Sequence, residues 1–196
     1  MYRLFIAGLD AAVASVLIIP AFILLNRIYF HNWKKTVFYT VFSVYLSGLY
    51  LVTGFPNVAY VRFEPNINLI PFLNMFSDFS AVLLNILLFL PLGFLSAIQW
   101  KFMRTYKYNL ILGSCVSLSV EILQLFTFRA TDVNDLITNT LGNLIGWSMA
   151  MVILRYFPKF SCNGAKKDAF VVFTAVFCIM FFIHPFIAPM IWELIY

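Results

Sequence analysis

The chain has 196 residues, of which 63% are hydrophobic and only 11% are charged, and its mean hydropathy is +0.92. A soluble domain has about 25% charged residues, so this composition excludes that class and predicts an integral membrane protein. The net charge of +5 does not indicate a nucleic-acid partner, because the basic residues lie in short loops between apolar runs, where they orient a chain in the bilayer.

Long apolar runs predict an all-α, polytopic transmembrane bundle of about six helices, forming a single integral membrane domain over residues 1–196. The runs cover residues 4–25, 36–53, 81–100, 109–128, 132–157 and 169–190. The connection between the second and third runs contains Pro56, Pro65 and Pro71, which exclude one continuous helix. Its middle is apolar, so we expect a re-entrant or interfacial segment around residues 60–80.

The distribution of basic residues predicts the orientation of these helices. Most of the 13 Lys and Arg residues lie in the loops after the first, third and fifth runs. Cytoplasmic loops carry such an excess, so these loops are predicted to face the cytoplasm of a multi-pass cell-membrane protein. Both termini are then expected outside the cell.

Polar residues gather in the stretch 121–146, between and within the fourth and fifth runs. Glu121, Asp132 and Asp135 are three of only eight acidic residues in the chain. Four residues, Asp132, Asp135, Asn139 and Asn143, form one polar stripe along a helix, because their spacings are three, four and four residues. Side chains this costly in a membrane are expected to meet each other, and the predicted orientation places them on the extracellular side.

Two further signals mark the start and the packing of the fifth helix. Thr131 or Asp132 is a plausible N-cap, and Asp135 in the first turn is favoured by the helix dipole. Gly142 and Gly146 form a GxxxG pattern beside the polar face, which permits close contact with a neighbouring helix. Together these signals predict that this face points into the bundle.

Four short motifs in this region resemble the VanZ-like membrane family. They are the sequences NLIPF at 68–72, NILLFLPLG at 85–93, EILQ at 121–124 and RATDVNDLITNTLG at 129–142. Their order and spacing fit the family over a VanZ-like core of about residues 66–146. The resemblance implies a protein of Gram-positive-type membranes linked to low-level resistance to lipoglycopeptides such as teicoplanin, and it supplies no agreed mechanism.

The first functional hypothesis is an outward-facing pocket that binds or modifies an anionic ligand. Glu121 and Asp135 would be catalytic acid and base groups, since desolvation raises the pKa of one carboxylate above that of the other. Arg129 would hold a phosphate or carboxylate. A lipid-linked cell-wall intermediate, a surface polymer or the antibiotic itself would fit such a site. The ligand-binding residues would be Asn68, Asn85, Gln124, Arg129, Asp132 and Asn139.

The cofactor and the class of function remain open at this point. No residue is assigned as a metal ligand, and no zinc motif such as HExxH occurs, although carboxylates with amide oxygens suit Mg²⁺ or Ca²⁺. A second hypothesis makes the polar residues structural, with hydrogen bonds that fix the helices together. A third makes the chain a transporter or ion-coupled component, with a carboxylate as a relay.

Overall fold

The computed structural model describes residues 2–55, 63, 67–72, 79–127 and 130–195. The chain folds into two compact units. Unit 1 comprises Met1–Val52 and Gly164–Tyr196, and unit 2 comprises Thr53–Asn163. The predicted VanZ-like core, residues 66–146, lies within unit 2. A single domain over the whole chain stays a prediction.

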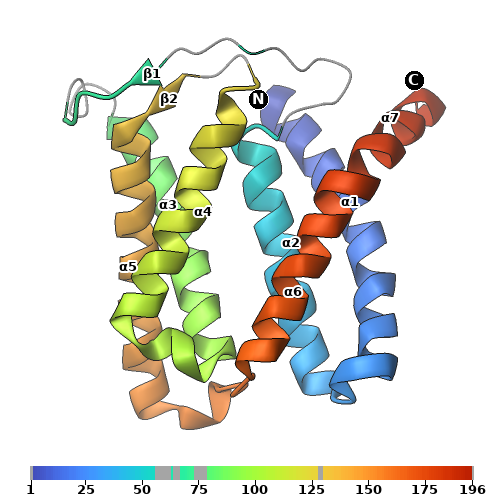
Figure 1. Ribbon diagram of the computed structural model, residues 1–196, viewed down its shortest axis with the longest axis vertical. Coiled ribbons are helices and arrows are strands. Elements are labelled where there is room, and N and C mark those ends of the chain that lie inside the picture. Colours follow the sequence, from blue (N-terminus) through green and yellow to red (C-terminus); the bar gives the residue numbers. More distant parts are fainter. Residues whose placement is uncertain (1, 56–62, 64–66, 73–78, 128–129, 196) are drawn as a thin grey trace. The chain divides into compact units, whose positions relative to one another are not determined.

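Unit 1 is built from helices near the two ends of the chain (Figure 1). In the second half, α6, η5 and α7 follow one another without a break. The Asp168 carboxylate joins α6 to α2, because its Oδ2 accepts hydrogen bonds from Lys35 Nζ at 3.0 Å and Tyr39 Oη at 2.8 Å. The elements are α1 (Tyr2–Leu25), the π-helical turn η1 (Asn26–Phe30), α2 (Trp33–Thr53), α6 (Lys166–Cys178), the π-helical stretch η5 (Ile179–Ile183) and α7 (His184–Ile195).

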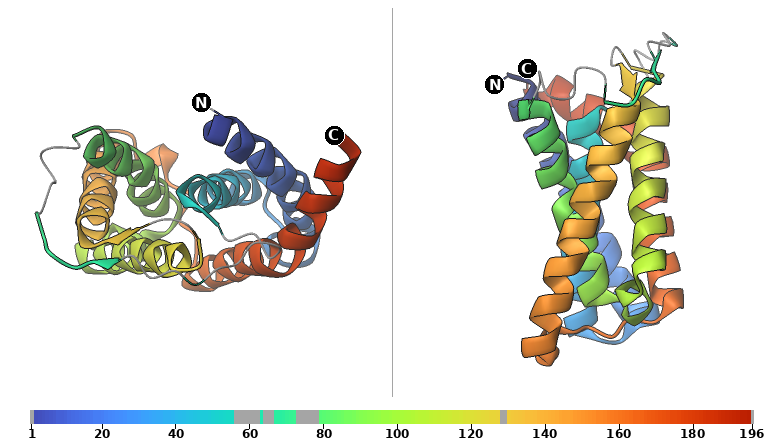
Figure 2. Two further views of the ribbon diagram at one scale, coloured as in Figure 1. Left: turned by 90° about the horizontal axis from the view of Figure 1, so that it is seen from above. Right: turned by 90° about the vertical axis from the view of Figure 1, so that its left-hand side faces the viewer.

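Unit 2 contains three long helices with a two-stranded pairing at one end. Seen end-on, α5 lies between α3 and α4 (Figure 2). Short 3-10 turns, η3 and η4, connect the helices at the other end. The elements are β1 (Ile67–Asn68), α3 (Phe79–Gln99), η3 (Lys101–Arg104), α4 (Tyr106–Gln124), β2 (Thr131–Asp132), α5 (Val133–Tyr156) and η4 (Pro158–Phe160).

The predicted all-α membrane fold is confirmed. Five helices within the described residues are long and apolar enough to cross a membrane. They are the stretches Gly8–Phe30, Trp33–Thr53, Phe79–Gln99, Val133–Tyr156 and Lys166–Ile191. The predicted fourth span, α4, is a helix but is not among these five. It carries Asn109, Glu121 and Gln124, which lower its hydropathy, and all three are buried.

The GxxxG pattern has the close neighbour that the sequence predicted, and that neighbour is α3. A Cβ atom added to Gly146 would lie 2.8 Å from the carbonyl carbon of Leu90, and one added to Gly142 would lie 2.8 Å from Cα of Ile86. The contact is reciprocal, because a Cβ on Gly93 of α3 would lie 2.8 Å from the backbone nitrogen of Trp147. Only glycine permits two helix backbones to approach this closely.

The end of α4 and the segment around residues 60–80 differ from what the sequence indicated or cannot be compared with it. Helix α4 ends at Gln124 and not near Phe128, so Glu121 lies in its last turn and not deep inside it. The early end is a correction, and turn residues from Leu125 to Thr127 replace the predicted last turn. The expected interfacial segment around 60–80 falls largely outside the described residues. Its described part contains β1 and the exposed side chains of Leu69, Ile70 and Phe72.

Candidate functional site

A short parallel pairing brings the first and last motifs of the polar region together. Ile67 pairs with Thr131 and Asn68 pairs with Asp132, although 64 residues separate the partners. The side chains continue this contact, since Asn68 Nδ2 donates to Asp132 Oδ2 at 3.1 Å. The pairing lies at the end of unit 2 where α4 finishes and α5 begins (Figure 1).

Asp132, one of the two N-cap candidates in the sequence, is the N-cap of α5. Its Oδ1 accepts the backbone N–H of Asn134 at 2.8 Å, which satisfies one of the free donors at the helix start. The backbone N–H of Asp132 donates in turn to Glu121 Oε2 at 3.0 Å. Thr131 adds a hydrogen bond from Oγ1 to the Glu121 carbonyl, also at 3.0 Å. The last turn of α4 therefore holds the first residues of α5.

One turn further along α5, Asp135 meets a residue from α3. Asn85 Nδ2 donates to Asp135 Oδ1 at 2.8 Å and contacts Thr138 Oγ1 at 3.4 Å. Asn134 faces the loop after β1, because its Oδ1 accepts the backbone N–H of Phe72 at 2.7 Å. The loop, α3 and α5 thus converge on the same end of the unit.

Four of the predicted site residues form one half-buried group, which we call the carboxylate cluster. Its members are Asn68, Asn85, Asp132 and Asp135. In both pairs an asparagine N–H donates to a carboxylate oxygen, and the other oxygen of Asp132 accepts the backbone N–H of Asn134. A half-buried carboxylate of this kind can accept further hydrogen bonds from hydroxyl or ammonium groups of a ligand.

The other predicted site residues have different positions. Glu121 is 5% exposed and holds the backbone at Asp132, so its carboxylate is not open to a ligand in this structure. Gln124 Nε2 donates to the Thr53 carbonyl at 3.2 Å. Asn139 Nδ2 donates to Ser117 Oγ at 3.1 Å, inside the helix contact. Arg129 lies outside the described residues.

A second polar group deeper in unit 2, the amide cluster, was missed by sequence reasoning except for Asn143. Its members are Ser96, Asn109 and Asn143, which are all fully buried. Asn109 Nδ2 donates to Ser96 Oγ at 2.9 Å, and Asn143 Nδ2 donates to Asn109 Oδ1 at 2.8 Å. No clear signal was present in the sequence, because Asn109 lies about 80° around the helix from Ser117 and about 120° from Glu121 at 3.6 residues per turn.

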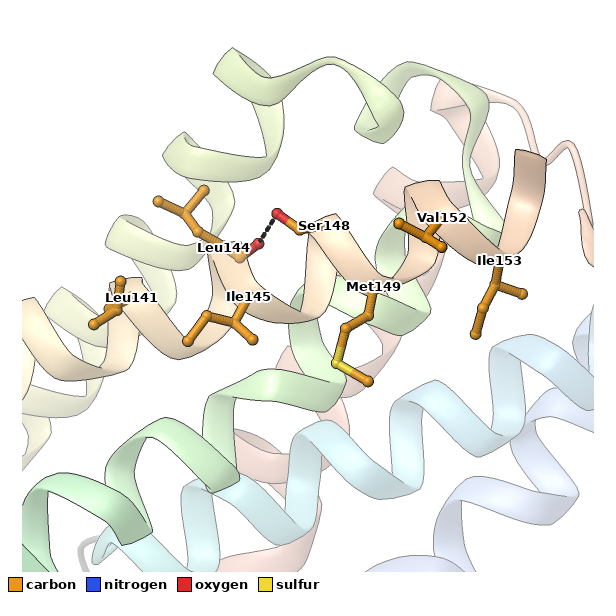
Figure 3. A pocket seen from close by; sticks show the side chains of 7 residues that line it. All are labelled: Leu141, Leu144, Ile145, Ser148, Met149, Val152 and Ile153. Carbon is orange, nitrogen blue, oxygen red and sulfur yellow. Dashed lines mark hydrogen bonds between the residues drawn. The ribbon is translucent and has the colours of Figure 1, made fainter. Parts of the chain in front are cut away.

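Two hollows in the surface of unit 2 lie away from the carboxylate cluster. One has a volume of about 590 Å³ and is lined by side chains of α5 between Leu141 and Ile153 (Figure 3). The other has a volume of about 530 Å³, and Arg104 and Arg155 line it. Neither hollow includes a residue of the carboxylate cluster, so this pair of cavities gives no support to the predicted pocket.

The described part of the site does not fit a metal ion as it stands. No group of three or more His, Cys, Asp or Glu side chains is placed to hold a metal among the residues that the structure describes. Asn68 and Asn85 direct their amide nitrogens, not their oxygens, at the carboxylates. Mg²⁺ and Ca²⁺ require oxygen ligands, so these two amides cannot serve them in this arrangement.

Comparison with known proteins now places the chain in a family. The profile of the family described as VanZ/LLP1 matches residues 36–155, which include the whole carboxylate cluster and the whole amide cluster. The chain belongs to the VanZ/LLP1 family. The match extends beyond the core of residues 66–146 that the motifs had indicated, and it takes in most of α2 and nearly all of α5.

Among relatives of this VanZ/LLP1 chain is "Protein VanZ" of Enterococcus faecium. The two sequences are 29% identical over 117 residues, which cover 58% of this chain and 66% of that protein. The matched region is therefore slightly less than two thirds of the relative's length. No solved structure matches the chain.

Proposed function

We propose that the carboxylate cluster is part of a ligand-binding site on the extracellular side of the membrane, through which the protein contributes to low-level resistance to teicoplanin-type lipoglycopeptides. The convergence of β1, β2, α3 and α5 on two half-buried carboxylates is the observation that carries the proposal. Family membership, with a relative named VanZ, supports the resistance phenotype.

The extracellular location is argued from charge. Within unit 2, the end opposite the carboxylate cluster carries Lys101, Arg104 and Lys107 around the start of α4, and Arg155 at the end of α5. An excess of basic residues marks the cytoplasmic end of membrane helices. The carboxylate cluster then faces outward, where cell-wall intermediates, surface polymers and the antibiotic are found.

The proposed ligand is an anionic, lipid-linked or cell-surface molecule with hydroxyl or amine groups. Asp132 and Asp135 would accept hydrogen bonds from those groups, and Arg129, three residues before Asp132, would bind the anionic group. The exposed Leu69 and Phe72 beside the cluster suit contact with the lipid around such a ligand. Binding is preferred over acid–base chemistry, because Glu121, the second catalytic candidate, is buried against backbone.

A substitution of Asp135 by Asn tests the proposal. It removes the charge and keeps the shape, so protection of a Gram-positive host against teicoplanin should be lost at matched protein expression. Glu193→Gln is the control, because Glu193 is an exposed carboxylate on α7. Full protection by the Asp135→Asn variant would remove the case for a site.

A purely structural role is the competing function, and the hydrogen bonds of Glu121 and Asn139 specifically favour it for those two residues. The two accounts differ in what accompanies the loss of protection. If Asp135→Asn loses protection and unfolds at a clearly lower temperature, the cluster holds helices together and binds nothing. If protection is lost while the melting temperature is kept, the site account stands.

A further inference from the structure

The basic end of unit 2 contains a hollow whose lining combines two cations with apolar side chains. Its volume is about 530 Å³, and its lining residues are Arg104, Met151, Val152, Leu154 and Arg155. None of the five is acidic, so the two positive charges are not neutralised by a carboxylate in the lining. Such a surface favours a ligand that has a negative group attached to hydrocarbon.

Arg104 is held in a fixed position by several elements of the unit. Its Nε donates to the Ala97 carbonyl at 3.3 Å, and its Nη2 donates to Ser161 Oγ and to Asn163 Oδ1. Its own carbonyl accepts the indole N–H of Trp147 on α5 at 3.2 Å. These partners are neutral, so the guanidinium is oriented but keeps its full charge for an anion.

The two arginines are both cations, but one is partly buried and the other is exposed. Burial lowers the pKa of Arg104 from its ordinary value, but an arginine remains cationic at neutral pH. Partial burial also reduces the screening of its charge by water. Arg155 is exposed in the last turn of α5, where it can approach an anion from the solvent side.

A second, apolar hollow adjoins this basic hollow, and because all its lining residues belong to α5 it is a shallow, open groove along one helix. The hollow of about 590 Å³ is lined by side chains from Leu141 to Ile153, and Val152 lines both cavities. Figure 3 shows these side chains following one another along the helix. At 1.5 Å per residue the groove is about 18 Å long, close to the roughly 15 Å of hydrocarbon in one leaflet.

We propose that Arg104 and Arg155 bind the headgroup of an anionic phospholipid whose acyl chain lies in the groove along α5. A free phosphate would gain nothing from Met151, Val152 and Leu154, and a zwitterionic lipid would bring its own cation to the arginines. A second protein helix would fill the groove without neutralising two charges. The site is separate from the carboxylate cluster and does not depend on its function.

The proposed binding of an anionic phospholipid is tested by measuring which lipids the protein retains. The full chain is placed in nanodiscs of equal parts phosphatidylglycerol and phosphatidylcholine, released, and examined by native mass spectrometry for bound lipid. Phosphatidylglycerol should be retained in preference. The Arg104→Gln/Arg155→Gln variant should retain at least about tenfold less of it, as expected for two basic contacts of this kind.

Matched variants separate a built site from general surface charge. Lys101→Gln/Lys107→Gln removes the same charge near the same end and should change retention by less than about twofold. Val152→Trp fills the position shared by both cavities and should also reduce retention, whereas Leu118→Trp on an exposed face of α4 should not. Arg155→Gln alone covers the case in which loss of Arg104 disturbs folding, and it should still weaken retention severalfold.

Three results would overturn the proposal. One is equal retention of the two lipids by the unaltered chain. Another is an equal loss in the arginine and lysine variants, which would reduce the effect to surface charge. The third is full retention in Val152→Trp together with displacement of the lipid by inorganic phosphate, which would leave a simple anion site without a role for the groove.

Discussion

The amide cluster links α3 to α5 through Asn109 of α4, whereas in the carboxylate cluster Asn85 of α3 meets Asp135 of α5 directly. The two clusters also differ in what surrounds them. Ser96, Asn109 and Asn143 are fully buried and donate to one another or to backbone. Asp132 and Asp135 are half-buried, and each carboxylate accepts a hydrogen bond from an asparagine amide. A fully buried N–H donor must find its acceptor within the protein, whereas a half-buried group can exchange its partners with a ligand. We therefore expect the first cluster to contribute to stability, and the proposed function gives recognition to the second.

The largest expected loss of stability comes from a change in the close backbone contact between α3 and α5. Gly146→Ala places a methyl group against the Leu90 backbone and should destabilise the protein by roughly 3 kcal/mol. Gly48→Ala on α2 is the matched control, because nothing lies within 4 Å of a Cβ there. Tryptophan fluorescence during thermal unfolding in detergent measures both variants. Equal melting temperatures would mean that α3 and α5 are not in close contact.

Removal of the centre of the amide cluster should have the next largest effect. Asn143→Leu removes the two hydrogen bonds that Asn143 Nδ2 donates to Asn109, one to its Oδ1 and one to its backbone carbonyl. The loss should lower the free energy of unfolding by about 1–2 kcal/mol. Ser148→Ala on the same helix is the control, since its hydroxyl bonds only to its own helix at Leu144. Protection against teicoplanin, measured at equal amounts of folded protein, should survive in Asn143→Leu. Its loss there would contradict the division between the clusters.

The N-cap residue of α5, Asp132, is expected to affect both stability and protection. Asp132→Ala removes the acceptor for the Asn134 N–H and should destabilise the protein by about 1 kcal/mol, whereas Asp132→Asn keeps a capping oxygen and should change stability much less. If recognition requires the charge, both variants lose protection although their melting temperatures differ. Protection that follows the melting temperature instead would make Asp132 a capping residue and nothing more.

The smallest stability change is expected for Asp135→Asn, within about 0.5 kcal/mol, because a half-buried charge with an amide partner is replaced by an amide of the same shape. Thermal unfolding in detergent and in nanodiscs is the measurement. A loss as large as that of Asn143→Leu would place Asp135 among the residues that hold the helices together, and the comparison between the clusters would fail.

The sequence was most informative where a local rule applied. Hydropathy located the apolar helices, the residue types at 131–135 indicated the cap, and the GxxxG pattern indicated a close contact. The identity of the partner was not predictable, because it depends on how α3 is rotated about its axis. For the same reason Asn68, Asn85 and Asp135 could be proposed as neighbours of a site, but their pairing with specific partners could not be derived.

The errors have physical causes as well. The end of the fourth helix was predicted too late because apolar residues continue past Gln124, although the helix ends there in a turn. Ser96 was overlooked because it is a single small polar residue in an apolar run, and Asn109 because it closely follows the charged loop that ends with Lys107. Only their contact reveals a cluster. The position of Arg129, on which the anionic ligand depends, lies outside the described residues and stays a prediction.

The pairing of β1 with β2 has a consequence for how the chain enters the membrane. Two backbone segments can pair only on one side of the bilayer, so the chain between Asn68 and Asp132 must cross it an even number of times. Helix α3 supplies one crossing, and α4 must supply the other in spite of its polar residues. If α4 did not cross the membrane, β1 and β2 would lie on opposite sides of the bilayer and could not pair. The pairing therefore predicts that α4 crosses the membrane as the return partner of α3.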